Sequence, residues 1–189
     1  MTAVPSTEEA IAATREWLEK AVIGLNLCPF ARSVYTGERV RFIVSEATTP
    51  GALLDKLADE LETLHAANPQ TCETTLLIHP RVLTDFLDYN DFLDAADALL
   101  EDMGLEGEIQ LASFHPHYQF ADVEADDITN YTNRSPYPTL HLLREDSISR
   151  AVDAVPDTDA IIAKNVETMK RLGQDGWRRL WKASPEEPS

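Results

Sequence analysis

Hydrophobic residues recur at helical spacing along much of the chain. Within residues 6–23, Ile11, Leu18 and Val22 keep the spacing that places side chains on one face of a helix. Ser6 offers a side-chain oxygen that can cap the first turn of this helix. The same spacing predicts further helices over residues 51–66, 81–88, 91–103, 147–155 and 158–172.

Shorter segments with alternating or uniformly apolar character predict four strands, at residues 40–46, 74–79, 108–114 and 139–143. Because helices and strands alternate along the chain, crossover connections are expected to build an α/β fold. We predict a single domain over residues 1–189, in which helices cover a mostly parallel or mixed four-stranded sheet. The last two strands are joined by a long loop and can run antiparallel. The ordered core covers about residues 6–182, and the tail from Ser184 is expected to be loose.

The loop between the last two strands differs in composition from the rest of the chain. Residues 115–137 include His115, Tyr118, Asn133 and Arg134 and show no sustained helical or strand periodicity. A structureless connection of this length is either functional or disordered, and its aromatic residues argue against disorder. We therefore predict that this loop folds back over the rim of the sheet and lines an enclosed site.

The polar side chains of this region suit a small enzyme that acts on an anionic small molecule. His115, at the end of a strand, would act as an acid, a base or a metal ligand, with His141 on the adjacent strand. The guanidinium groups of Arg134 and Arg144 would hold the anionic group. Each histidine can instead be structural, and each arginine can pair with an internal acidic side chain. The predicted site residues outside Cys28 are His115, His141, Arg134, Arg144, Asn133 and Tyr118.

The histidines also allow a metal-binding interpretation. Two adjacent strands can bring His115 and His141 together, and imidazole is a common ligand of transition metals. Cys28 or His117 would supply a third ligand. The spacing of these residues matches no established zinc signature. A metal ion is therefore one cofactor that the sequence allows, without a defined set of ligands.

Cys28 lies at the predicted start of a short helix, where the helix dipole and Arg32 would favour the thiolate. The sequence CPFA at this point resembles the single-cysteine active-site motif of glutaredoxins and omega-class glutathione transferases, which implies thiol redox chemistry. Two features depart from that pattern. A predicted helix precedes Cys28, and the segment that resembles a cis-proline loop, residues 137–140, follows about 110 residues later. Cys28 is thus either a nucleophilic or redox-active thiol or an inert buried cysteine.

Composition excludes several classes of partner. Sixteen Lys and Arg residues stand against 33 Asp and Glu residues, for a net charge of −17 and no basic stripe that would bind nucleic acid or anionic lipid. No apolar stretch approaches the roughly 18 residues of a membrane span. The N-terminus shows no signal-peptide pattern, and two cysteines do not suggest a secreted disulfide scaffold, so a cytoplasmic protein is expected. The oligomeric state is left open.

No Walker loop, GxGxxG, GxSxG or EF-hand motif occurs in the sequence. The chain nevertheless resembles, through VIGLNLCPFA, ETTLLIHP, IQLASFHPHYQF and TNRSPYPTLHLLREDSI in order, a bacterial and plastid family catalogued as domain of unknown function number 1415. The resemblance covers roughly residues 10–182 and implies a cytoplasmic single-domain protein. It brings no activity and assigns no catalytic residue. A small enzyme, a metal-binding protein, a thiol redox protein and a non-catalytic module that binds a ligand or partner all remain open.

Overall fold

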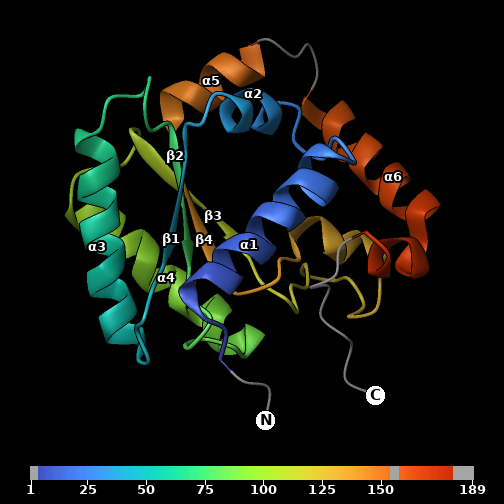
Figure 1. Ribbon diagram of the computed structural model, residues 1–189, viewed down its shortest axis with the longest axis horizontal. Helices are drawn as coiled ribbons and strands as arrows, with labels where there is room; N and C mark the ends of the chain where they lie inside the picture. The colour runs from blue at the N-terminus through green and yellow to red at the C-terminus, as the bar shows by residue number, and fades with distance from the viewer. Residues whose placement is uncertain (1–3, 154–157, 181–189) are drawn as a thin grey trace.

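The sheet lies at the centre of the computed structural model, which describes residues 4–153 and 158–180 (Figure 1). Within these ranges the strand order is β1-β2-β4-β3, with β1 parallel to β2 and β4 antiparallel to both β2 and β3. The prediction of an α/β fold with a mixed four-stranded sheet is confirmed, and the long loop joins two antiparallel strands. The predicted loose tail from Ser184 lies outside the described residues. The strands are β1 (Val40–Val44), β2 (Thr74–Ile78), β3 (Ile109–Phe114) and β4 (Thr139–Arg144).

Helices cover both faces of the sheet (Figure 1). On one face, α3 (Pro50–Ala66) and α4 (Phe86–Asp102) bury leucines together with Leu140 and Leu142 of β4. On the other face, Leu76 of β2 packs among residues of the N-terminal helices and α6. The elements of this second layer and its edge are α1 (Thr7–Trp17), its π-helical continuation η1 (Leu18–Ile23), α2 (Ala31–Thr36), the 3-10 helix η2 (Ile128–Asn133), α5 (Glu145–Asp153) and α6 (Thr158–Arg178).

Local signals fix where the long helices begin. Ser6 forms a capping box with Glu9 at the start of α1, and Thr49 accepts a hydrogen bond from the backbone of Ala52 at the start of α3. In α6, the backbone changes direction at Gly173, whose φ of 64° suits a residue without a side chain. The first helical segment of α6 therefore ends at Gly173, in agreement with the helix predicted over residues 158–172, and a second segment follows it.

The prediction of two helices over residues 81–88 and 91–103 is wrong. A single helix, α4, begins at Phe86, because the carboxylate of Asp85 accepts hydrogen bonds from the backbone of Leu87 at 2.8 Å and of Asp88 at 3.2 Å. Asn90, which has a side chain suited to capping a helix that starts at residue 91, lies inside this helix. Asp85, five residues before Asn90, is the cap, since its side chain reaches two of the free amides.

Strand alternation decides which side chains reach which layer. In β4, Leu140 and Leu142 enter the core beneath α3 and α4, so His141 between them faces the layer of α1 and η1. The partners of His141 in the neighbouring strands are Leu76 of β2 and Ala112 of β3. None of the helices in the described ranges is both long and apolar enough to cross a lipid bilayer.

Candidate functional site

His115, the predicted acid or base, is fully buried against α4 and has both ring nitrogens engaged. Its Nε2 lies 3.1 Å from the carbonyl oxygen of Leu83, and its Nδ1 accepts a hydrogen bond from the backbone of His117 at 3.0 Å. Its ring also packs on Tyr89, with 5.1 Å between ring centroids. Burial lowers the pKa of His115 to about 4. The contacts thus hold a neutral imidazole that fixes the start of the loop.

Arg134 holds the loop together through backbone carbonyl groups. Its Nε donates to the carbonyl oxygen of Tyr118 at 3.2 Å, and its Nη2 donates to that of Ala125 at 2.7 Å. Its guanidinium carbon lies 4.0 Å from the centre of the Tyr131 ring. Asn133 adds a bond from Nδ2 to the carbonyl oxygen of Ser113 at 3.1 Å. These contacts explain why an irregular segment can be well packed.

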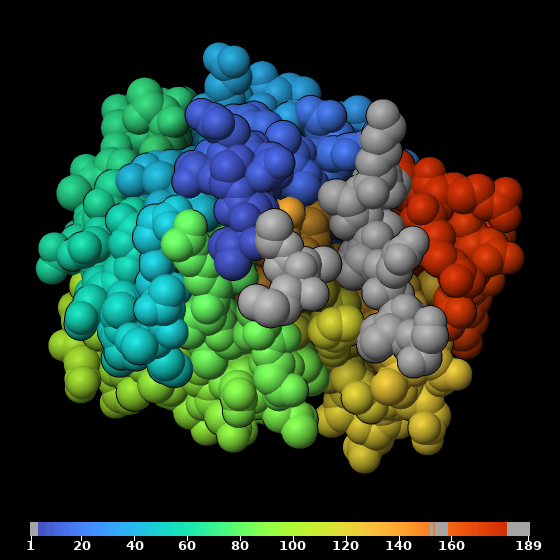
Figure 2. Space-filling view, turned by 60° about the horizontal axis from the view of Figure 1, so that its bottom comes forward, coloured from blue at the N-terminus to red at the C-terminus, as the bar shows by residue number. Residues whose placement is uncertain are grey.

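The loop forms part of the molecular surface beside α6, where Figure 2 shows it in yellow and gold between the green of α4 and the red of α6. With the start of α4 it lines an open hollow of about 720 Å³. The hollow includes Arg134 and His117, but also the carboxylates of Asp85 and Asp126. Acidic side chains at this position would repel the anionic molecule that the sequence suggested.

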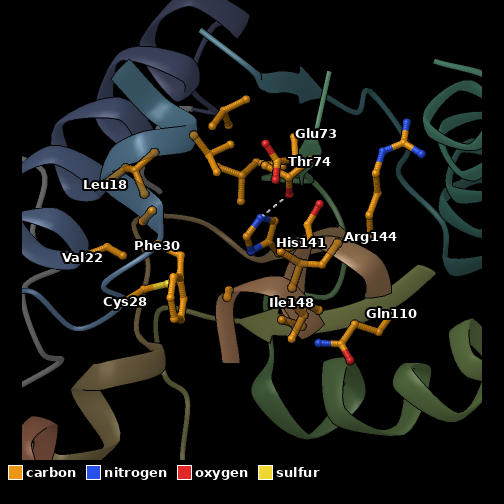
Figure 3. Close-up of a pocket in the computed structure, with 18 of the residues that line it drawn as sticks. Leu18, Val22, Cys28, Phe30, Glu73, Thr74, Gln110, His141, Arg144 and Ile148 are labelled. Atoms are coloured by element: carbon orange, nitrogen blue, oxygen red, sulfur yellow. Dashed lines mark hydrogen bonds between the residues drawn. The ribbon is translucent and has the colours of Figure 1, made fainter. Parts of the chain in front are cut away.

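Arg144 likewise contacts backbone rather than an acidic side chain. Its Nη2 lies 2.5 Å from the carbonyl oxygen of Leu64 and 2.7 Å from that of Ala67, at the C-terminal end of α3. The last carbonyl groups of a helix have no partner inside the helix, and a guanidinium group satisfies them well. In Figure 3 the guanidinium of Arg144 points away from His141.

A cavity of about 330 Å³ lies on the other face of the sheet, and His141 lies on its floor (Figure 3). We call it the sheet cavity. Its walls come from the end of α1, from η1, from α2 and the turn before it, from all four strands and from α5. They are mainly apolar and include Leu18, Val22, Phe30, Leu76, Phe114 and Ile148. The small side chain of Ala112, opposite His141 on β3, leaves room beside the imidazole.

The hydrogen bonds of Thr74 define the tautomer of His141. The hydroxyl of Thr74 donates its proton to the carbonyl oxygen of Leu142 at 2.7 Å. The same hydroxyl oxygen lies 2.5 Å from Nε2 of His141, so it accepts the Nε2 proton (Figure 3). Nδ1 then carries the lone pair of a neutral imidazole. Within the described residues Nδ1 has no hydrogen-bond partner.

Desolvation alone lowers the pKa of His141 to about 4, so its imidazole is neutral near pH 7. The side chain is only partly buried, and the surface it keeps exposed faces the sheet cavity. Other charged groups at the edge of the cavity are already paired, since Glu73 forms an ion pair with Arg39. The sheet cavity therefore presents Nδ1 of His141 as a hydrogen-bond acceptor within walls that are mainly apolar.

Cys28 lines the same cavity as His141, and Figure 3 shows its sulfur beside Phe30. The helix that follows, α2, begins at Ala31 and has six residues. Cys72 packs against the core beneath α3 and α4, whereas Cys28 packs against the opposite core, so the two thiols lie in different layers. No peptide bond in the described ranges is cis, including the one before Pro138. Cys28 therefore lines the cavity, but the described residues contain no cis-proline of the kind that the resemblance to glutaredoxins suggested for residues 137–140.

The structure groups His141 and Cys28 at the sheet cavity, and it places His115, Arg134 and Tyr118 at the loop. In residues 4–153 and 158–180, no three His, Cys, Asp or Glu side chains are grouped as a metal site would require. Sequence reasoning missed Thr74, which orients the imidazole. The strand predicted over residues 74–79 could have indicated it, because side chains two positions apart share a face, and Thr74 therefore lies on the face of Leu76.

Comparison with known proteins gives a family and no function. Neither a curated protein nor a solved structure matches the chain. Residues 9–179 match the model of a family described as a protein of unknown function, DUF1415. That match covers the sheet, the sheet cavity and the loop, and the chain therefore belongs to the DUF1415 family.

Proposed function

We propose that this protein binds a small, uncharged and largely apolar molecule in the sheet cavity, with a hydrogen-bond donor of that molecule on Nδ1 of His141. The volume of about 330 Å³ lies within the range of ligand pockets, roughly 300–1,000 Å³. Apolar walls with one or two oriented polar groups are typical of such pockets. An alcohol, a phenol or an amide would fit this description.

The free acceptor on His141 is the observation that carries this proposal. A polar atom that faces an apolar environment without a partner costs about 1–3 kcal/mol. A donor group of a ligand recovers that cost and leaves the apolar part of the ligand against Leu18, Phe30 and Ile148. Thr74 adds specificity, because it fixes the Nε2 proton and so prevents Nδ1 from acting as the donor.

Charge favours an uncharged ligand over the anionic one that the arginines suggested. Arg144 donates to backbone carbonyl groups at the end of α3, and Arg39 is paired with Glu73. His141 is neutral near pH 7 because burial lowers its pKa to about 4. A carboxylate in the sheet cavity would lose its hydration without gaining a free positive charge in return.

Binding of simple six-carbon compounds tests the proposal. An uncharged, environment-sensitive dye is displaced with 1-hexanol, 1-chlorohexane, hexanoate or hexylammonium at neutral pH. We expect 1-hexanol to bind most tightly, and the His141→Leu variant to bind it about three- to tenfold more weakly, since one hydrogen bond is lost. The affinity for 1-chlorohexane, which has no donor, should stay within about twofold of the wild-type value.

His65→Leu is the matched control, because His65 is exposed on α3 and lies away from the cavity. It should bind every compound as the wild type does. Tightest binding of hexanoate, or an unchanged affinity of His141→Leu for 1-hexanol, would contradict the proposal.

Covalent catalysis is the second candidate, because the thiol of Cys28 and the imidazole of His141 line one cavity. In this reaction His141 takes the thiol proton on Nδ1 as Cys28 attacks the carbonyl carbon of an ester. The bond to the ester oxygen breaks, and the imidazolium returns the proton to that oxygen, so that the alcohol leaves and a thioester remains on Cys28. A p-nitrophenyl hexanoate probe should then leave a hexanoyl group on Cys28, detected by mass spectrometry, and none in Cys28→Ser. Equal labelling of Cys72 would show only general thiol reactivity.

A further inference from the structure

A second hollow adjoins the sheet cavity and extends it toward α6. It measures about 460 Å³ and is lined by η1, the loop and α6. We call it the α6 hollow. Val22, Cys28 and Phe114 line both hollows, so these three side chains form the junction between them.

The junction lies close to His141. The ring of Phe114 is 6.2 Å from the imidazole of His141, between centroids, and 5.2 Å from the ring of Trp17. The thiol of Cys28 has no hydrogen-bond partner in the part of the chain that the structure describes. Movement of this small side chain therefore breaks no polar contact. A chain that passes from His141 toward α6 meets only an aromatic ring, a valine and a thiol.

The outer part of the α6 hollow carries exposed apolar side chains. Phe120 is 37% exposed and Ile162 is 64% exposed, and both line this hollow. They belong to the few large hydrophobic residues that are exposed within the described ranges. Thr129 and Asn165 lie at the same hollow and give it a partly polar rim. Apolar side chains around a hollow at the surface are typical of a ligand entrance.

We propose that the ligand is a long-chain uncharged amphiphile, whose hydroxyl group meets His141 and whose alkyl chain passes Cys28 into the α6 hollow. This proposal rests on the proposed function and extends it to a substrate class. The sheet cavity alone holds about ten groups the size of a methylene, at roughly 30 Å³ each, the volume of a water in the liquid. A longer chain has to continue through the junction.

A chain-length series of primary alcohols tests the extension on the full chain. Displacement of an uncharged dye gives the affinities of 1-hexanol, 1-decanol, 1-dodecanol and 1-tetradecanol. Each methylene that enters an apolar site adds about fourfold to the affinity. We expect this increase to continue beyond 1-decanol in the wild type. In Cys28→Phe, the affinity should still rise from 1-hexanol to 1-decanol, but 1-tetradecanol should bind no better than 1-decanol.

Cys72→Ala is the matched control, because Cys72 packs against the core on the opposite face of the sheet and lines neither hollow, so the whole series should be unchanged. If Cys28→Phe does not fold, Cys28 is alkylated with N-ethylmaleimide in a Cys72→Ser chain, which places a similar group at the junction. An affinity that stops rising at 1-decanol in the wild type overturns the extension and leaves the proposed function intact. Absence of 1-hexanol binding overturns both.

Discussion

His115 and His141 both lie in the interior of the protein, but they differ in how many of their ring nitrogens have hydrogen-bond partners. Burial lowers the pKa of each to about 4, so both rings are neutral near pH 7. His115 uses both nitrogens within the protein, one toward Leu83 and one toward His117. His141 uses only one, toward Thr74, and its other nitrogen faces the sheet cavity. A perturbed pKa therefore marks burial in both cases, and only the uncommitted nitrogen indicates a binding site.

The regions around the two histidines differ in the same way. The loop of residues 115–137 is rich in polar side chains, but Arg134 and Asn133 are bonded to backbone carbonyl groups. The sheet cavity has few polar groups, yet it combines volume with a free acceptor. A cluster of reactive residue types is thus weaker support for a site than one polar atom without a partner beside an apolar cavity.

The largest expected effect is acid destabilisation, which both regions should share. For His79, His115 and His141 the folded-state pKa is about 4, below the unfolded value of about 6.5. The unfolded chain therefore binds more protons between these values. Stability is complete above about pH 6.5 and is lost as the pH falls toward 4, by about 2 kcal/mol per histidine at pH 5.

Urea unfolding at about pH 7.5 and pH 5 measures this loss. His141→Leu should remove about a third of it. A free energy of unfolding that does not change between the two pH values would contradict the lowered pKa values of the three buried imidazoles.

The next effect separates the two histidines at neutral pH. His115→Leu leaves the carbonyl oxygen of Leu83 and the amide of His117 without partners, at a cost of about 2–4 kcal/mol. His141→Leu loses one bond to Thr74 and adds apolar surface to an apolar cavity, so its free energy of unfolding should change by about 1 kcal/mol or less. Urea midpoints of the two variants give the difference directly. Equal losses would mean that His141 is as structural as His115.

The sequence predicted the fold well where periodicity and caps are local. The strand predicted over residues 139–143 is present as β4, and strand alternation accounts for His141 lying on the face opposite Leu140 and Leu142. Local signals also gave the first turn of α1. They failed at α4, because Asp85 and Asn90 are both suitable caps and only the free amides after Asp85 decide between them.

The site was harder to predict, because it depends on contacts between distant residues. The carbonyl group that contacts His115 belongs to Leu83, 32 positions away, and one that accepts from Arg144 belongs to Leu64, 80 positions away. Each contact occupies a side chain that the sequence suggested for ligand binding. The walls of the sheet cavity come from η1, α2, all four strands and α5. No local pattern indicates that these elements leave a space between them.

Arg144 tests, with a smaller expected effect, whether a polar side chain that is bonded to backbone carbonyl groups supports the fold and does not bind a ligand. Arg144→Met keeps the length of the side chain but leaves the carbonyl groups of Leu64 and Ala67 without their donor, and we expect a loss of about 2 kcal/mol in unfolding free energy. Arg81→Met is the control, since Arg81 forms an exposed ion pair with Glu46, a contact worth at most about 1 kcal/mol. An unchanged stability with a loss of anion binding would restore the predicted role of Arg144.

The smallest expected effect concerns the two thiols. Cys28 lines the sheet cavity and Cys72 packs on the opposite core, so a ligand in the cavity should slow alkylation of Cys28 alone. With 1-hexanol at ten times its dissociation constant, we expect iodoacetamide to modify Cys28 about tenfold more slowly, because about a tenth of the protein stays free. Peptide mass spectrometry reads both sites in one sample, with Cys72 as the internal reference. Equal protection of both thiols would indicate a general stabilisation of the chain, and an unprotected Cys28 would place the alcohol outside the sheet cavity.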